Sequence, residues 1–279
     1  MKVCQKCNRL NPDNADICMG CRSSISHVST TDQRGVKDSV DQLIKEGLLS
    51  TESAKEMRHD ADRIVKVPDL SATYQDPVFS CFLYDASGSM SVCREDVIAS
   101  QPIMLDALRG SAKCRHRALF VAQYLFSHNS KQLHGFRLLA QAPETDDVKI
   151  LDRSLYDPNG GTALYKTLYS ILQDMVVIIE SCSSNGLSPQ FTIGLITDGE
   201  DTEKGVSPDS IQKIIQDLRA RRILRSAVII GLVNNQLSND RLEQIKRAIG
   251  FDQAIPCSQE TARDIRRAFV LASQSAVGA

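Results

Sequence analysis

From Pro77 onward, continuously apolar runs alternate with longer amphipathic stretches, and this alternation restricts the fold more than any other feature of the chain. Three runs, at 78–85, 191–197 and 227–233, lack the apolar–polar alternation of a half-buried strand, which predicts strands buried on both faces. Amphipathic stretches predict helices at 101–113, 162–181, 209–221, 239–249 and 260–275. Pro102 is expected in the first turn of the first helix. Buried strands joined by helices predict an α/β fold, a doubly wound, mostly parallel sheet with helices on both faces.

Further strands are expected at 117–127 and 133–140, as a hairpin, and at 253–256. The chain has 279 residues, of which 42% are hydrophobic and 24% charged, so it can fill one large core with small additions. We predict three parts: residues 1–24, a zinc ribbon; residues 25–76, a helical and partly flexible linker; and residues 77–279, the α/β domain. In the linker, Val36, Val40 and Leu43 recur at helical spacing, and Ser50-Thr51 could cap a second helix.

Nine cysteines fall into two groups. Cys4-x-x-Cys7 and Cys18-x-x-Cys21 have the spacing of a tetrahedral zinc site with four thiolate ligands. So few residues cannot bury a core, so Zn²⁺ would supply most of the folding free energy. A redox role for the Cys-x-x-Cys pairs is the alternative. The five scattered cysteines are expected to be buried thiols: Cys81, Cys93, Cys114, Cys182 and Cys257.

Three short loops follow or precede predicted elements and carry hydroxyl and carboxylate oxygens. The first buried run ends in Asp85-Ala86-Ser87-Gly88-Ser89, the turn Asn159-Gly160-Gly161-Thr162 opens a helix, and Thr197-Asp198-Gly199 ends another buried run. In a doubly wound sheet, ligands bind at the carboxyl ends of the strands. Carboxylates with hydroxyls are hard-oxygen ligands, which suit Mg²⁺ or Mn²⁺ better than zinc. Each motif alone is an ordinary turn, and the glycine turn alone is a simple helix cap.

Together the three loops resemble the metal ion-dependent adhesion site of the von Willebrand factor A family. The resemblance covers about residues 77 to 275, and five residues stand at the five positions of the family's motif: Asp85, Ser87, Ser89, Thr162 and Asp198. It implies a bound Mg²⁺, or Mn²⁺ or Ca²⁺, with waters completing its shell. One water would be replaced by an Asp or Glu of another protein, so the chain would be a binding adaptor and not an enzyme. Partners of related proteins include AAA+ ATPases, kinases and phosphatases.

Composition limits the other function classes. The formal net charge is −1, which makes general nucleic-acid binding unlikely, and the basic run Lys213, Arg219, Arg221, Arg222 and Arg225 suits a solvated helix end. The apolar runs are shorter than the roughly 20 residues that span a bilayer, and the first residues carry no secretory signal, so a cytoplasmic protein is expected. Two alternatives stay open: a Mg²⁺-dependent phosphate-ester hydrolase with Asp85 as nucleophile, and a structural subunit of a nucleic-acid-processing assembly.

Overall fold

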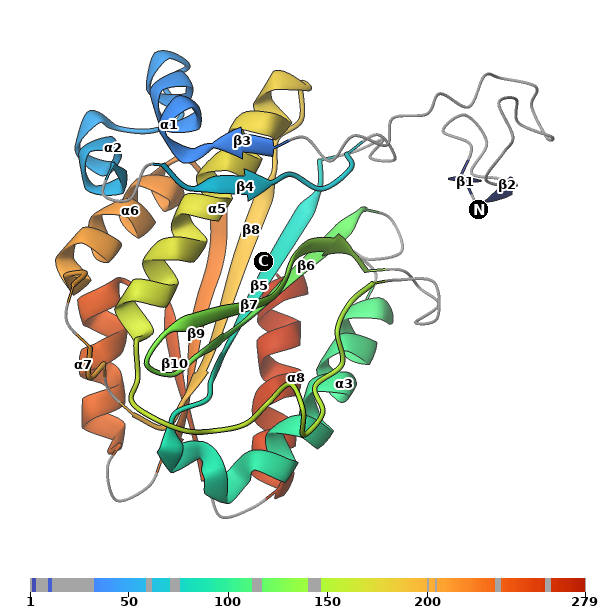
Figure 1. The fold of residues 1–279 in the computed structure, drawn as a ribbon, viewed down its shortest axis with the longest axis vertical. Coiled ribbons are helices and arrows are strands. Elements are labelled where there is room, and N and C mark those ends of the chain that lie inside the picture. Colours follow the sequence, from blue (N-terminus) through green and yellow to red (C-terminus); the bar gives the residue numbers. More distant parts are fainter. Residues whose placement is uncertain are drawn as a thin grey trace.

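The computed structural model describes residues 2–3, 10–11, 33–58, 62–70, 76–111, 117–139, 147–199, 201–203, 205–233, 237–258 and 262–278. Its centre is a six-stranded sheet in the order β10-β9-β8-β5-β6-β7 (Figure 1). The strands are β5 (Val78–Asp85), β6 (Leu119–Phe126), β7 (Ser130–Leu138), β8 (Gln190–Thr197), β9 (Leu224–Val233) and β10 (Gln253–Ser258). All neighbours pair in parallel except β6 and β7, which form the expected hairpin. The α/β fold with a mostly parallel sheet is therefore confirmed.

Helices cover both faces of this sheet (Figure 1). Helices α5 (Leu164–Ser184), α6 (Pro208–Ala220) and α7 (Asn239–Ile249) lie on one face, and α3 (Arg94–Arg109) and α8 (Ala262–Gly278) pack together on the other. On β5, Phe79, Cys81 and Leu83 enter the first core, whereas Phe82 and Tyr84 enter the second. Because successive side chains of a strand point to opposite faces, a strand covered on both sides is mostly apolar, as β5 is apart from Ser80 and Asp85.

Helix α3 begins earlier than the sequence pattern predicts. A 3-10 turn, η1 (Gly88–Cys93), leads directly into Arg94, so Pro102 lies inside the helix and not in its first turn. An interior proline removes one helical hydrogen bond and costs about 3 kcal/mol. The apolar residues Val97, Met104 and Leu108 are fully buried between the sheet and α8, and this burial offsets the cost.

The segment predicted as a linker contributes to the core of the domain. It forms α1 (Val36–Lys45), α2 (Thr51–Met57) and a small antiparallel pair, β3 (Gln33–Gly35) and β4 (Ile64–Lys66). The Ser50 hydroxyl accepts from the Ser53 amide as the predicted helix cap. Helix α1 packs on α5 and α2 packs on α6, and Leu43 and Met57 are fully buried there. These helices form a further layer outside α5 and α6 (Figure 1).

The described residues at the start of the chain form one short antiparallel pair, β1 (Lys2–Val3) with β2 (Leu10–Asn11). The predicted zinc ligands Cys4, Cys7, Cys18 and Cys21 lie outside the described residues, so the zinc ribbon stays a prediction. Of the five scattered cysteines, four are confirmed as buried free thiols: Cys81, Cys93, Cys182 and Cys257. Cys114 also lies outside the described residues. None of the helices in the described part of the chain is both long and apolar enough to cross a membrane.

Candidate functional site

The sheet topology brings two of the predicted loops to one edge. Strands β5 and β8 are parallel neighbours, with Tyr84 opposite Ile196, so Asp85 and Thr197 end adjacent strands at the same height. Asp198 follows directly after β8. Both carboxylates, Asp85 and Asp198, have no solvent-exposed surface. Burying two carboxylates side by side costs free energy unless hydrogen bonds, protons or a cation compensate their charge.

A series of hydrogen bonds, the first of them from a backbone amide, connects four of the five predicted residues. The Ser87 amide donates to Asp85 Oδ1 at 2.8 Å, and the Ser87 and Ser89 hydroxyls lie 3.1 Å apart. The Ser89 hydroxyl donates to Asp198 Oδ1 at 2.8 Å. The tight turn after β5 makes this path possible, because it returns both serines to the side of the two carboxylates.

Thr162 reaches the same place through the backbone. The Gly88 amide donates to the Gly160 carbonyl at 3.0 Å, and the Asn159 amide donates to the Ala86 carbonyl at 2.8 Å, so the glycine turn lies against the serine turn. Thr162 is 5% exposed, and its amide donates to the Thr202 hydroxyl at 2.8 Å. The structure therefore places all five predicted residues around one end of β5.

Glycine is required at both positions before Thr162, because side chains pack closely against the turn. Gly160 has a φ of +76°, a left-handed conformation, and an added Cβ would lie 2.3 Å from the His128 ring. A Cβ on Gly161 would lie 2.8 Å from the Thr202 hydroxyl. The Nδ1 atom of His128 also accepts a hydrogen bond from the Gly161 amide at 3.2 Å, and it lies 3.1 Å from a Glu203 carboxylate oxygen. Only glycines permit the turn to fit between these side chains.

Two residues that the sequence motifs did not assign to the site also form hydrogen bonds with Asp85. The Thr197 hydroxyl donates to Asp85 Oδ2 at 2.5 Å, and the Tyr156 hydroxyl donates to the Asp85 carbonyl at 2.6 Å. Thr197 stands inside the predicted loop, so its place at the end of a buried strand was a usable signal. Tyr156 lies in a region without regular structure, and no sequence pattern links it to Asp85.

Burial raises the pKa of Asp85 from 3.8 to about 6, and the nearby charge of Asp198 adds to the rise. Hydrogen bonds from Thr197 and Ser87 act in the opposite direction. The pair is thus electrostatically unfavourable when both carboxylates are charged. A divalent cation would relieve the repulsion between the two carboxylates. The available metal ligands, two carboxylates and three hydroxyls, are the hard oxygens that Mg²⁺, Mn²⁺ and Ca²⁺ prefer.

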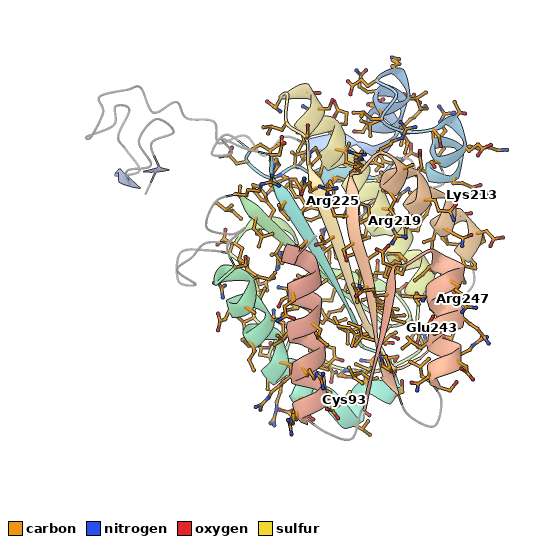
Figure 2. The ribbon with its side chains drawn as sticks, turned by 180° about the vertical axis from the view of Figure 1, so that it is seen from behind. Cys93, Lys213, Arg219, Arg225, Glu243 and Arg247 are labelled. Carbon is orange, nitrogen blue, oxygen red and sulfur yellow. The ribbon has the colours of Figure 1, made fainter. Side chains whose placement is uncertain are left out.

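The predicted basic run lies away from this site. Figure 2 shows Lys213 and Arg225 in the upper half of the molecule and Cys93, which ends the turn after Ser89, near its lower end. Lys213 pairs with Glu56, Arg219 with Asp252 and Arg221 with Asp217. These three cations form ion pairs within the fold; of the predicted basic run, Arg219 lies in the last turn of α6, whereas Lys213 lies in its middle and Arg225 in β9.

Solved structures of known proteins share this architecture. The pilus adhesin SpaC from Lactobacillus rhamnosus GG, in an open conformation, aligns with a TM-score of 0.50 and 11% identity over 77% of this chain and 31% of the adhesin. A von Willebrand factor type A protein from Catenulispora acidiphila aligns with a TM-score of 0.48 and 16% identity. The chain shares the α/β architecture of the aligned part of the adhesin.

That alignment with the Catenulispora acidiphila protein covers 72% of this chain and 43% of the other, so the chain spans less than half of that protein's length. Manganese-loaded TRAP protein from Plasmodium vivax aligns with a TM-score of 0.41 and 16% identity, over 70% of this chain and 74% of that one. No protein-family model and no curated protein sequence matches the chain. At these identities the similarity concerns the fold alone.

Proposed function

We propose that the chain is a metal-dependent protein-binding module that captures an acidic side chain of a partner through a divalent cation. The cation would be held by Asp85, Ser87, Ser89, Thr162 and Asp198. The observation that carries the proposal is the buried carboxylate pair, in which the Ser87 amide bonds Asp85, the Ser89 hydroxyl bonds Asp198, and the two serine hydroxyls lie within hydrogen-bond distance of each other. A fold alone does not imply a function, so the proposal depends on this arrangement of side chains.

The protein's own residues have two tasks in this function. Thr197 and the Ser87 amide hold the Asp85 carboxylate in place, so that its orientation is set before a ligand arrives. The hydroxyls of Ser89 and Thr162 offer neutral oxygens beside the two charges. A bound divalent cation would keep a coordination position for a carboxylate from outside. Without the cation, the negative charges of Asp85 and Asp198 would repel an incoming carboxylate.

We propose binding and not catalysis, with Mg²⁺, Mn²⁺ or Ca²⁺ at this site and Zn²⁺ at the four N-terminal cysteines. A phosphate-ester hydrolase with Asp85 as nucleophile would need that carboxylate to reach a substrate. Asp85 instead is fully buried and its two oxygens already accept hydrogen bonds from Thr197 and Ser87. An assay with p-nitrophenyl phosphate and Mg²⁺ separates the two functions, because sustained Asp85-dependent turnover would favour the enzyme.

The direct test of the site is Mn²⁺ binding, followed by electron paramagnetic resonance, for the wild type, Asp85→Ala and Asp240→Ala. Asp240 is an exposed acid on α7 and serves as the matched control. We expect the wild type and Asp240→Ala to bind Mn²⁺ alike and Asp85→Ala to lose most of the binding. Equal Mn²⁺ binding by all three proteins would contradict the assignment of the site.

The test of partner binding is a pull-down in Mg²⁺ and in EDTA, after which the captured partner is titrated against the wild type and Asp85→Ala. We expect binding only for the wild type in Mg²⁺. Equal binding in all four conditions would show that the metal site is not the recognition surface.

A further inference from the structure

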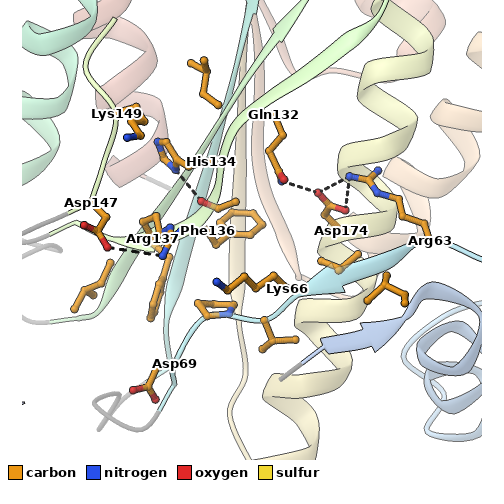
Figure 3. A pocket seen from close by; sticks show the side chains of 18 residues that line it. Arg63, Lys66, Asp69, Gln132, His134, Phe136, Arg137, Asp147, Lys149 and Asp174 are labelled. Carbon is orange, nitrogen blue, oxygen red and sulfur yellow. Dashed lines mark hydrogen bonds and ion pairs between the residues drawn. The ribbon is translucent and has the colours of Figure 1, made fainter. Parts of the chain in front are cut away.

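A cleft of about 870 Å³ (Figure 3) lies beside strand β7, and neither Asp85 nor Asp198 lines it. One wall is β4 with the residues that follow it, up to Asp69, and the other is β7 with Asp147 and Lys149. Its floor is polar: the Asp174 carboxylate accepts from Arg63, Tyr124 and Gln132. Because Arg63 precedes β4, this cluster fixes β4 against α5 and keeps the cleft in shape.

Strand β7 is an edge of the described sheet, and its backbone faces the cleft. The Leu139 amide donates to the Leu119 carbonyl on the β6 side at 2.8 Å. In an antiparallel ladder the next residue turns its amide and carbonyl the other way, so those of Leu138 point away from β6. The same argument applies to β4: Val36 donates to the Arg63 carbonyl, so the backbone groups of Ile64 point away from β3. Edge strands of this kind accept an added strand.

The side chains of the cleft indicate the chemistry of that strand. Leu138 is 44% exposed and Ile64 is 65% exposed, so each wall presents an apolar side chain. Arg63 pairs with Asp174, and Arg137 lies 3.8 Å from Asp147. Lys66 and Lys149 are both exposed and form no ion pair with the described residues. The β4 wall also carries Asp69, so the charged side chains that line the cleft are four cations and three carboxylates, which leaves a net charge of +1: Arg63, Lys66, Arg137, Lys149, Asp69, Asp147 and Asp174.

From these three observations we propose that β7 binds an extended, acidic segment of a partner protein as an additional strand. Main-chain hydrogen bonds to the outward groups of β7 would supply affinity. Alternate side chains would supply specificity, apolar ones against Leu138 and Ile64 and acidic ones toward Lys66 and Lys149. This surface is separate from the carboxylate pair. Leu138 lies opposite Phe120, beside the beginning of β5, whereas Asp85 ends β5.

The test uses the full chain and a fluorescein-labelled nine-residue peptide, as long as β7, in which glutamate alternates with valine or threonine. Fluorescence anisotropy is measured in EDTA, so that the metal site cannot contribute. We expect saturable binding that Asp85→Ala leaves unchanged. The same peptide with N-methyl groups on alternate backbone amides should bind at least about fivefold more weakly, since it cannot complete the ladder. Equal binding of the N-methylated peptide would overturn strand addition.

Two sets of variants test the protein side. Leu138→Pro removes the outward amide, and prolines are tolerated at such edge positions, whereas Leu138→Ala keeps the amide and serves as its control. We expect the proline variant to bind at least about fivefold more weakly than the alanine variant. If circular dichroism shows that Leu138→Pro fails to fold, the N-methylated peptide decides the same question.

The double variant Lys66→Glu/Lys149→Glu should weaken binding about tenfold through like-charge repulsion, and Lys37→Glu, an exposed lysine on α1, should not. Wild-type binding by the double variant would overturn the assignment of an acidic ligand to this cleft. Binding that requires Mg²⁺ would also overturn it, because the peptide would then be held at the carboxylate pair, which is the separate site of the proposed function.

Discussion

Replacing Asp85 with asparagine should make the metal-free protein more stable, although it removes the centre of the proposed site. Burial and the charge of Asp198 raise the pKa of Asp85 from 3.8 to about 6. This rise means that ionising Asp85 in the folded protein at pH 7 costs about 3 kcal/mol. Asparagine has nearly the same shape and carries no charge, so it avoids this cost.

Part of the gain is lost again through hydrogen bonds. Asp85 accepts from both Thr197 and the Ser87 amide, and an asparagine side chain has only one acceptor oxygen for the two donors. Losing one such bond costs about 1 kcal/mol or somewhat more. The net expectation in EDTA at pH 7 is an increase of about 1–2 kcal/mol in the free energy of unfolding. For a domain of this size that corresponds to a Tm higher by about 2–8 °C.

The pH dependence of stability tests independently whether ionised Asp85 destabilises the folded protein. Because the pKa of Asp85 is raised in the folded state, the folded protein binds more protons than the unfolded chain between pH 3.8 and about 6. This group's contribution therefore lowers the free energy of unfolding as the pH rises through that window, and it is constant above it. Asp85→Asn lacks this contribution, so its advantage over the wild type should be largest at pH 7 and smaller at pH 5.

The assay is thermal unfolding of the wild type, Asp85→Asn and the surface control Asp240→Asn, in EDTA at pH 5 and pH 7, and in Mg²⁺ at pH 7. Saturating Mg²⁺ should raise the Tm of the wild type and leave that of Asp85→Asn unchanged; a concentration of 100 Kd stabilises by about 2.7 kcal/mol. An Asp85→Asn protein that is less stable than the wild type in EDTA at pH 7, or a difference that does not depend on pH, would refute the electrostatic argument.

Three further outcomes are expected. Gly160→Ala should lower the free energy of unfolding in urea by about 1–3 kcal/mol, because the φ of Gly160 is +76° and the added Cβ would clash with His128. Adding His128→Ala should restore only part of the lost stability, since the backbone strain remains. Leu43→Ala should cost about 2–5 kcal/mol if the N-terminal helices are part of the core, with Lys37→Ala within about 0.5 kcal/mol as control. Elemental analysis of protein purified without chelator should find one zinc per chain, lost in a Cys4→Ser/Cys7→Ser variant; an absence of zinc in the wild type would contradict the ribbon.

Much of the central sheet can be predicted from the sequence alone, because strands buried on both faces appear as continuous apolar runs. Strand β5 and helix α7 have the predicted bounds, Val78–Asp85 and Asn239–Ile249. An apolar run that is too short for a helix core and lacks alternation fits only a covered strand, and α7 shows a clear amphipathic period between a capping Ser238 and Gly250. The loops that end β5 and β8 were likewise predictable, since their motifs follow directly after such strands.

Tertiary structure alone decided which segments lie against these elements. Helix α5 is buried on nearly all sides, including Asp174 and Glu180, which means that a second layer covers its outer face. The sequence predicts a helix at 162–181 but does not indicate which segment covers its outer face. In the structure, residues 33–58 and 62–67 cover it, where Arg34 pairs with Glu180 and Arg63 with Asp174.

The same limit applies to α3 and to the site. Pro102 is a helix breaker by local preference, yet packing against α8 keeps the helix continuous, because contacts from distant residues outweigh one missing hydrogen bond. Around the carboxylate pair, the sequence identified the residues that carry oxygen ligands. The hydroxyl of Tyr156 and the ring of His128 reach the site only through the fold, since local patterns specify which elements form but not which distant side chains meet.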